Sequence, residues 1–172
     1  MKMADPEEGQ TKQGKRIEIP LDQYFRDNYE GMVQMAGEFE KELGKERVLA
    51  IAERMNVERS VARLRRKLAS VPHESLEDFV SYHDGIMGAD FTRDTQSGEK
   101  VEVAPTKFVF VMRECHWAKT FRELGAADLG YALNCSSDFE YARCFNPKLR
   151  LARPKTLMRG DDCCEFIYTW EE

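Results

Sequence analysis

The run Lys107-Phe108-Val109-Phe110-Val111-Met112 decides the fold class, because aromatic and β-branched residues fill it almost without interruption. This composition predicts a buried strand over 107–112. The segments 149–153 and Cys164–Trp170 alternate apolar with polar residues, which is typical of strands with one buried face. Antiparallel pairing of the strand 107–112 with Cys164–Trp170 would bring Cys115 and Cys164 to the same edge of a sheet.

Helical spacing of apolar residues dominates the chain before these strands. Apolar side chains recur at three- and four-residue steps over 21–43, 46–71 and 74–88, which predicts three helices. The apolar stripe of the second helix shifts its phase near Asn56, so we expect a kink or a break there. The N-terminal half of the chain is therefore predicted to be helical.

The pattern changes after the third helix. Residues 91–103 alternate in a two-residue period around the turn-like 96–98, which predicts a hairpin. Helices are expected again over 115–124 and 127–144, before the last two strands. The predicted fold class is α+β, with N-terminal helices followed by an antiparallel sheet with inserted helices.

Length and charge narrow the class of protein. A chain of 172 residues suits one domain. Residues 1–16 are polar and are expected to be a disordered N-terminal segment, which leaves 17–172 as a single α+β domain.

A net charge of −5 argues against a nucleic-acid partner. No apolar run reaches the ~18 residues of a membrane span. The N-terminus lacks the apolar part of a signal peptide, so we expect a cytoplasmic protein without a membrane partner.

The five cysteines all lie in the C-terminal part of the chain. An odd number of cysteines without an export signal favours reduced thiols over disulfides. Their spacing lacks the close pairs typical of structural zinc sites, so we expect no metal and no other cofactor.

Two further groups of residues have an ordinary structural explanation. Seven Arg or Lys residues between 47 and 67 could belong to a helix-turn-helix, but the interleaved Glu residues favour a solvated helix face. His73 and His83 lie beside predicted loops or helix ends and are expected at the surface or in a capping role.

An ordered set of motifs between 108 and 168 resembles a known family. The set comprises Cys115-His116-Trp117, FRELG at 121–125, DLGY at 128–131, CSSDF at 135–139, FNP at 145–147, LARPKTLM at 151–158 and GDDCCEF at 160–166. Together these motifs resemble the L-2-amino-thiazoline-4-carboxylic acid hydrolase family and, more distantly, small-molecule-binding domains of the 4-vinyl reductase type. The resemblance implies hydrolytic opening of a 2-aminothiazoline carboxylate ring, which gives a carbamoyl-cysteine.

Ring opening of that substrate class needs a base for the attacking water and an acid for the departing sulfur or nitrogen. Asp138 or His116 could be the base, and Cys115 or Cys164 could be a thiolate nucleophile or the acid. Cys115 falls near a predicted helix N-terminus, where the helix dipole lowers the pKa of a thiol. We therefore expect Cys115 or Cys164 to be an activated thiolate.

A substrate carboxylate needs a cation, ideally the fork of an arginine. Arg153 or Lys155 could supply it, and Cys135, Asn146 and Thr156 are further candidates for substrate contacts. Arg153 shares its strand parity with apolar residues, so its charge is expected on the buried face and needs a partner there. A purely structural salt bridge to a nearby Asp is the alternative.

The sequence leaves functions from different classes open. The first is a hydrolase of a cyclic 2-aminothiazoline carboxylate or a similar small C–N or C–S substrate. The second is a non-catalytic small-molecule-binding or sensor domain with the same pocket. In both cases the expected partner is a small molecule, and a homodimer through the N-terminal helices is also compatible with the sequence. The third is a helical interaction protein whose N-terminal helices dimerise.

Overall fold

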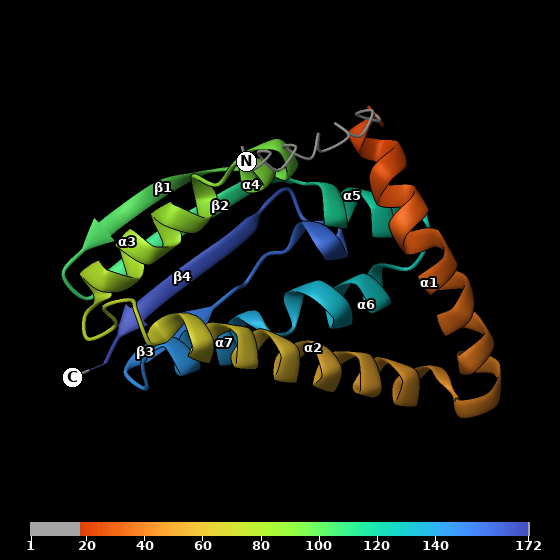
Figure 1. Ribbon diagram of the computed structural model, residues 1–172, viewed down its shortest axis with the longest axis horizontal. Helices are drawn as coiled ribbons and strands as arrows, with labels where there is room; N and C mark the ends of the chain where they lie inside the picture. Colours follow the sequence, from red (N-terminus) through yellow and green to blue (C-terminus); the bar gives the residue numbers. More distant parts are fainter. Residues whose placement is uncertain (1–17, 172) are drawn as a thin grey trace, which may run out of the picture.

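A computed structural model describes residues 18–171. In this part of the chain, helices pack against one face of a four-stranded sheet (Figure 1). The predicted α+β class, with helices first and an antiparallel sheet after them, is confirmed. The segment 1–16, expected to be disordered, lies outside the described residues.

Two long helices form the N-terminal arm of the molecule. Helix α1 (Leu21–Leu43) and helix α2 (Lys45–Leu68) are joined by Gly44 alone. Gly44 has a φ of 81°, in the region that favours glycine, so the chain can reverse direction within one residue. The two helices consequently meet in a sharp elbow (Figure 1).

The kink expected near Asn56 is wrong, because α2 runs through that position without a break. The phase shift of its apolar stripe has another cause. Val48 and Ala52 pack into one hydrophobic cluster with α1, whereas Leu64 packs into a second cluster under the sheet. Asn56 lies between the two clusters, 3% exposed, and its Nδ2 donates to Ser136 Oγ at 3.3 Å. One continuous helix therefore contributes residues to both hydrophobic clusters.

Helix α3 (Leu76–Met87) begins with a capping box, in which Ser75 and Asp78 bond each other's backbone N–H. The hairpin predicted over 91–103 is wrong, because 91–95 lie in the short helix α4 (Asp90–Thr95) and the predicted turn 96–98 belongs to a strand, which pairs with the strand that contains 107–112. Thr95 is fully buried and donates from Oγ1 to the Phe91 carbonyl at 2.7 Å, which favours a helical turn over a strand.

The sheet has the strand order β1-β2-β4-β3, and every neighbouring pair is antiparallel. The predicted pairing of 107–112 with Cys164–Trp170 is confirmed, and Met112 lies opposite Cys164. Cys115 ends its strand three residues further on. The strands are β1 (Gln96–Ala104), β2 (Lys107–Cys115), β3 (Leu149–Ala152) and β4 (Cys164–Trp170).

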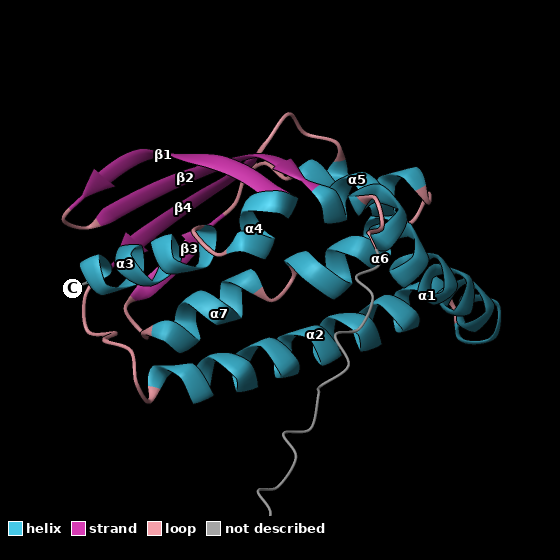
Figure 2. Ribbon diagram, turned by 45° about the horizontal axis from the view of Figure 1, so that its top comes forward, coloured by secondary structure: helices cyan, strands magenta, loops and turns pink. Residues whose placement is uncertain are grey.

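Short helical elements connect the strands, and the one that follows β2 extends beyond the end of the sheet (Figure 2). Residues 131–135 form a π-helical turn between two α-helices, and a 3₁₀ turn precedes the last strand. The elements are α5 (His116–Glu123), α6 (Ala127–Gly130), the π-helix Tyr131–Cys135, α7 (Asp138–Phe145) and the 3₁₀-helix Leu157–Arg159.

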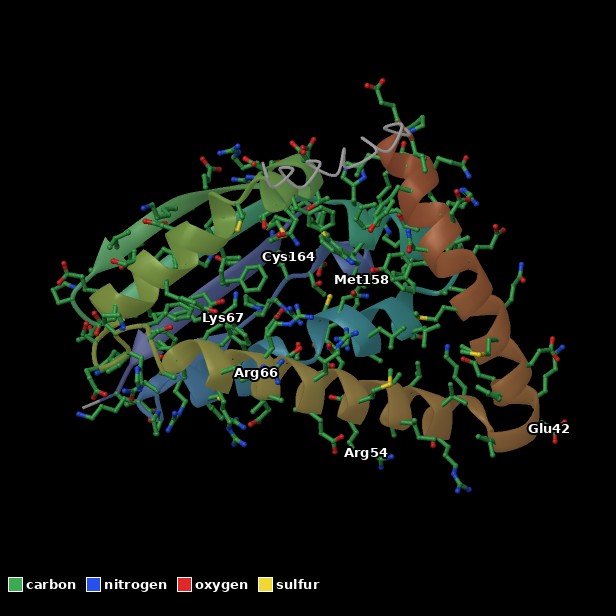
Figure 3. All side chains as sticks on the ribbon, viewed as in Figure 1. Glu42, Arg54, Arg66, Lys67, Met158 and Cys164 are labelled. Atoms are coloured by element: carbon green, nitrogen blue, oxygen red, sulfur yellow. The ribbon has the colours of Figure 1, made fainter. Side chains whose placement is uncertain are left out.

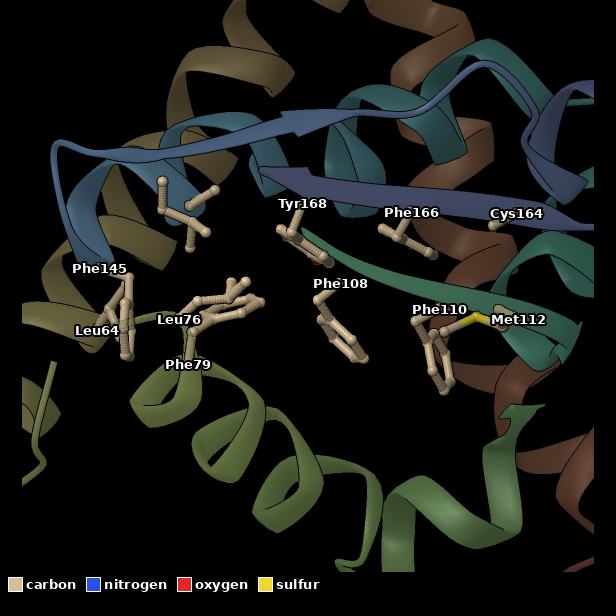
Figure 4. Packing of buried hydrophobic residues seen from close by; sticks show 12 residues of the cluster. Leu64, Leu76, Phe79, Phe108, Phe110, Met112, Phe145, Cys164, Phe166 and Tyr168 are labelled. Atoms are coloured by element: carbon tan, nitrogen blue, oxygen red, sulfur yellow. The ribbon is translucent and has the colours of Figure 1, made fainter. Parts of the chain in front are cut away.

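The main core lies between the inner face of the sheet and α2, α3 and α7 (Figure 4). Aromatic rings fill much of it. The ring of Phe79 lies 4.5 Å from that of Tyr168, and Phe108 stacks on Tyr168 at 5.7 Å between centroids. Within residues 18–171, no helix is both long and apolar enough to cross a membrane.

Candidate functional site

Arg153 follows β3 directly, and its side chain is only 1% exposed although it carries a full charge. Its Nη1 donates to the carboxylate of Asp138, and its Nη2 donates to the Cys135 carbonyl oxygen at 3.1 Å. Its Nε finds no hydrogen-bond partner among the described residues. A buried donor without an acceptor costs about 1–3 kcal/mol. The Nε–H of the guanidinium therefore lacks an acceptor in the described part of the chain.

Three aromatic rings enclose this guanidinium. Its central carbon lies 5.2 Å from the ring centroids of Tyr131 and Phe139 and 5.5 Å from that of Phe166. The rings come from the π-helical turn, from α7 and from β4. Contacts of this kind stabilise a cation away from water. They hold Arg153 in place without occupying its N–H groups.

Asp138 is the first residue of α7, and it combines two properties. The side chain is 32% exposed, yet burial raises the pKa of its carboxyl to about 6 against the opposing charge of Arg153. The surrounding protein therefore desolvates this carboxyl, although about a third of its side-chain surface stays accessible. A pKa near the operating pH is what a general base requires.

Thiols lie next to this ion pair. Burial raises the pKa of Cys135 above its usual range, and the charge of Asp138 adds to that rise. Cys115 and Cys164 are close enough to affect the same thiol. The structure thus brings Cys135, Asp138 and Arg153 into contact, with Cys115 and Cys164 beside them.

The expectation of an activated thiolate at Cys115 is wrong. Burial raises the pKa of the Cys115 thiol to about 11. The backbone N–H groups of Ala118 and Trp117, at the start of α5, lower that pKa but do not offset the burial. A helix N-terminus stabilises a thiolate only if the remaining desolvation is small. Cys115 is therefore a neutral thiol at pH 7.

Cys164 opens β4 (Figure 3), and the neighbouring strand β2 ends at Cys115, three residues past the partner of Cys164. The backbone N–H of Leu157 donates to its Sγ at 3.3 Å, and Thr156 Oγ1 lies 3.6 Å from the same sulfur. Thr156, a predicted substrate contact, is buried, and its own N–H donates to Asp161 at 2.7 Å. These contacts connect the loop after β3 to the first residue of β4.

His116 faces a different part of the molecule. Its Nδ1 lies 3.4 Å from Asp22 on α1, and its ring packs 5.5 Å from that of Phe25. Together with Cys115 and Arg122 it borders an open surface groove of about 710 Å³. The candidate bases Asp138 and His116 therefore belong to two separate places, one interior and one at the surface.

Two predicted substrate contacts are engaged elsewhere. Asn146 donates from Nδ2 to the His73 carbonyl and accepts the Lys148 N–H, each at 2.9 Å, so it joins two loops. Lys155 is half-exposed and forms an ion pair with Asp162 at 3.0 Å. Of the two predicted carboxylate partners, only Arg153 lies in the interior.

The expectation of a surface or capping role is wrong for His83. The ring lies in the core, with centroid distances of 4.6 Å to Phe110 and 5.1 Å to Phe108. Burial lowers the pKa of His83 to about 4. The sequence did indicate that His83 is buried, since it follows Phe79 by four residues and therefore shares the apolar face of α3. The aromatic rings around Arg153 gave no such signal, because three separate elements supply them.

Known proteins are similar to this chain in sequence pattern and in fold. The family model of L-2-amino-thiazoline-4-carboxylic acid hydrolase matches residues 25–168. No curated protein sequence matches the chain. A crystal structure of the phenol-responsive sensory domain of the transcription activator PoxR, with phenol, superposes with a TM-score of 0.53 at 10% identity. The match covers 81% of this chain and 73% of that one. That likeness shows the fold alone.

Within residues 18–171, no three His, Cys, Asp or Glu side chains gather closely enough to hold a metal ion.

The family match spans most of the chain, including every residue that surrounds Arg153. The protein therefore belongs to the L-2-amino-thiazoline-4-carboxylic acid hydrolase family.

Proposed function

We propose that the protein hydrolyses a small cyclic carboxylate of the 2-aminothiazoline type at the interior pair of Arg153 and Asp138. The observation that supports this most is the free Nε of the buried Arg153. A carboxylate is the natural acceptor for a guanidinium donor, and the water-poor surroundings strengthen such a bond. In this proposal Arg153 binds the substrate carboxylate.

Asp138 is the base in the proposed reaction. Its carboxylate removes a proton from water while the water oxygen forms a bond to the ring carbon between sulfur and nitrogen. As the carbonyl forms and the ring carbon–sulfur bond breaks, the remaining hydroxyl proton passes to the ring nitrogen, and the proton on Asp138 passes to the departing sulfur. Water is consumed, and the product is a carbamoyl-cysteine with a free thiol. A carboxyl pKa of about 6 lets Asp138 accept and return that proton near neutral pH.

A second candidate function is ligand binding without turnover. It is favoured by the raised pKa values of Cys115 and Cys135, which leave these two thiols without nucleophilic character at neutral pH. The fold likeness to a sensory domain agrees with it. In this case the Arg153 site would hold the carboxylate, and Asp138 would only balance the charge.

One set of measurements separates the two candidates. The full-length protein is incubated with 2-aminothiazoline-4-carboxylate, new thiol-bearing product is followed by mass spectrometry, and binding is measured by calorimetry. We expect turnover that Asp138→Asn abolishes while binding persists. Arg153→Lys should raise KM or Kd while the melting temperature stays close to that of the wild type, because lysine keeps the charge but loses the two-pronged geometry of the guanidinium.

Lys155→Ala is the matched control, since it removes a cation of the same loop that pairs only with Asp162 in the described structure. Its activity and binding should equal those of the wild type. Binding without turnover would favour the second candidate. Absence of both binding and turnover would contradict both.

A further inference from the structure

Large apolar side chains lie exposed on the two long N-terminal helices. On α1 they follow helical spacing at Met32, Met35, Phe39 and Leu43, which are 37%, 54%, 50% and 43% exposed. Residues at steps of three and four share one face of a helix. A continuous apolar stripe of this kind is typical of an interaction surface rather than of a free helix face.

The stripe continues from α1 onto α2. Ile51 and Met55 lie one turn apart on α2 and are 41% and 52% exposed. Met32 and Met55 border the same groove, of about 260 Å³, which α4, α5 and the π-helix also line. The exposed apolar stripes of the two helices meet at these two residues, and we call them together the elbow surface. It comprises Met32, Met35, Phe39, Leu43, Ile51 and Met55.

The two helices carry opposite charges. Helix α1 has six acidic and two basic residues, whereas α2 has eight basic and three acidic residues. Much of this charge is not neutralised within the molecule. Glu30 and Glu42 on α1, and Arg47 and Arg54 on α2, form no ion pair with any residue in the part of the chain that the structure describes. Figure 3 shows Glu42 and Arg54 extending away from the body of the molecule.

These charges flank the apolar residues on the same helix faces. Glu42 follows Phe39 by three residues, and Glu38 follows Met35 by three. On α2, Arg47 precedes Ile51 by four residues and Arg54 follows it by three. An acidic border on one helix and a basic border on the other make the elbow surface complementary to itself after a twofold rotation.

We infer that a second copy of this chain covers the elbow surface, with α1 of each protomer packed on α2 of the other. The twofold arrangement makes the same apolar and ionic contact twice. Glu38 and Glu42 of one copy would then face Arg47 and Arg54 of the other.

The oligomeric state of the full chain tests this inference by light scattering after size exclusion, at concentrations across about 1–100 μM. The wild type should have twice the chain mass of 20.0 kDa. Phe39→Glu should be monomeric, because it places a charge in the apolar stripe of an acidic helix. Val101→Glu is the control: Val101 is also apolar and 60% exposed but lies on β1, so this variant should stay dimeric. Unchanged circular dichroism and melting temperature would show that both variants fold.

Charge reversal tests the pairing of α1 with the partner's α2. Glu38→Arg with Glu42→Arg should weaken the dimer by about tenfold or more, as should Arg47→Glu with Arg54→Glu. All four substitutions in one chain should restore it, since both contacts are then ionic again with reversed sign. Each of three results would overturn the inference: a monomeric wild type, a dimeric Phe39→Glu protein, or a monomeric protein with all four charge reversals. None of these residues belongs to the Arg153 site, so the result is independent of the proposed function.

Discussion

Asp138 is the residue whose ionisation the proposed chemistry depends on most. Because its carboxyl pKa is raised to about 6, kcat/KM should increase with pH through that value as the carboxylate forms. Below pH 5 the rate should fall about tenfold per pH unit. A pH–rate profile measures this, and Asp138→Glu should shift the acidic limb, whereas Lys155→Ala should leave it in place. A rate that is flat between pH 5 and 7 would contradict the role of Asp138 as a base.

Asp138 and His83 should have opposite effects on stability in the same pH range. The folded state raises the carboxyl pKa of Asp138 from 3.8 to about 6, so it binds more protons than the unfolded state, and stability falls as pH rises. The folded state lowers the pKa of His83 from 6.5 to about 4, so the unfolded state binds more protons, and stability rises with pH. Between pH 4 and 6 the two contributions largely cancel.

In His83→Phe, the pH dependence of the free energy of unfolding should therefore come mainly from Asp138. The replacement ring suits a site lined by Phe79, Phe108 and Phe110. The free energy of unfolding of this variant, relative to the wild type, should fall on the order of 1 kcal/mol per pH unit from pH 4 to 6. Urea unfolding at several pH values measures it, with His73→Phe as a control outside the core. A constant difference between wild type and variant would contradict a neutral His83 in the fold.

At the scale of the element, α6 is held close to α5 and to the 3₁₀ turn at 157–159. A Cβ atom on Gly130 would lie 2.6 Å from Phe121 and 2.7 Å from the sulfur of Met158, which is 1% exposed. Gly130→Ala should consequently lower stability by about 1–3 kcal/mol through overpacking. Thermal melting measures the loss.

Gly85 provides the matched comparison for Gly130. It lies within α3, and a Cβ atom there would meet nothing within 4 Å among the described residues. Gly85→Ala should raise stability by about 0.5–1 kcal/mol, because alanine loses less conformational entropy in a helix. A Gly130→Ala protein that melted at or above the temperature of the wild type would refute the close packing of α6.

The regular elements could be predicted from sequence because each depends on a local pattern. The first three helices follow from apolar periodicity, and the strand 107–112 follows from its uninterrupted aromatic and β-branched residues. Its pairing with Cys164–Trp170 was compatible with the sequence but not required by it, and the structure confirms it. The kink at Asn56 was wrong because a phase shift has the same appearance whether a helix bends or passes between two cores. The helix Asp90–Thr95 was missed because six residues are too few to distinguish a helical turn from an alternating strand.

The site could be predicted only in part. The parity of Arg153 indicated a buried charge that needs a partner, and the structure provides Asp138 as that partner. The protonation of Cys115 could not be predicted, because proximity to a helix N-terminus is visible in sequence but burial at the junction of β2 and α5 is not. The separation of His116 from Asp138 depends on where α1 packs, which is a long-range contact.

At the scale of the whole molecule, two hydrophobic clusters share α2 and should unfold together. The two tryptophans report on them separately: Trp117 packs against the cluster of α1, α2 and α5, and Trp170 packs against the cluster under the sheet. The single-tryptophan variants Trp117→Phe and Trp170→Phe should each show one urea transition in fluorescence, coincident with circular dichroism of the same protein. Separate transitions within either variant would show that α2 does not couple the clusters.

The interior and the surface of the molecule offer two different places for a carboxylate ligand. Arg153 and Asp138 lie inside, and Arg122 and His116 border the surface groove. A crystal structure of the full-length protein with 2-aminothiazoline-4-carboxylate distinguishes them directly. We predict a carboxylate oxygen within about 2.7–3.2 Å of Arg153 Nε, with the ring next to Asp138. A ligand bound in the surface groove, with Arg153 Nε still without an acceptor, would contradict the proposed site.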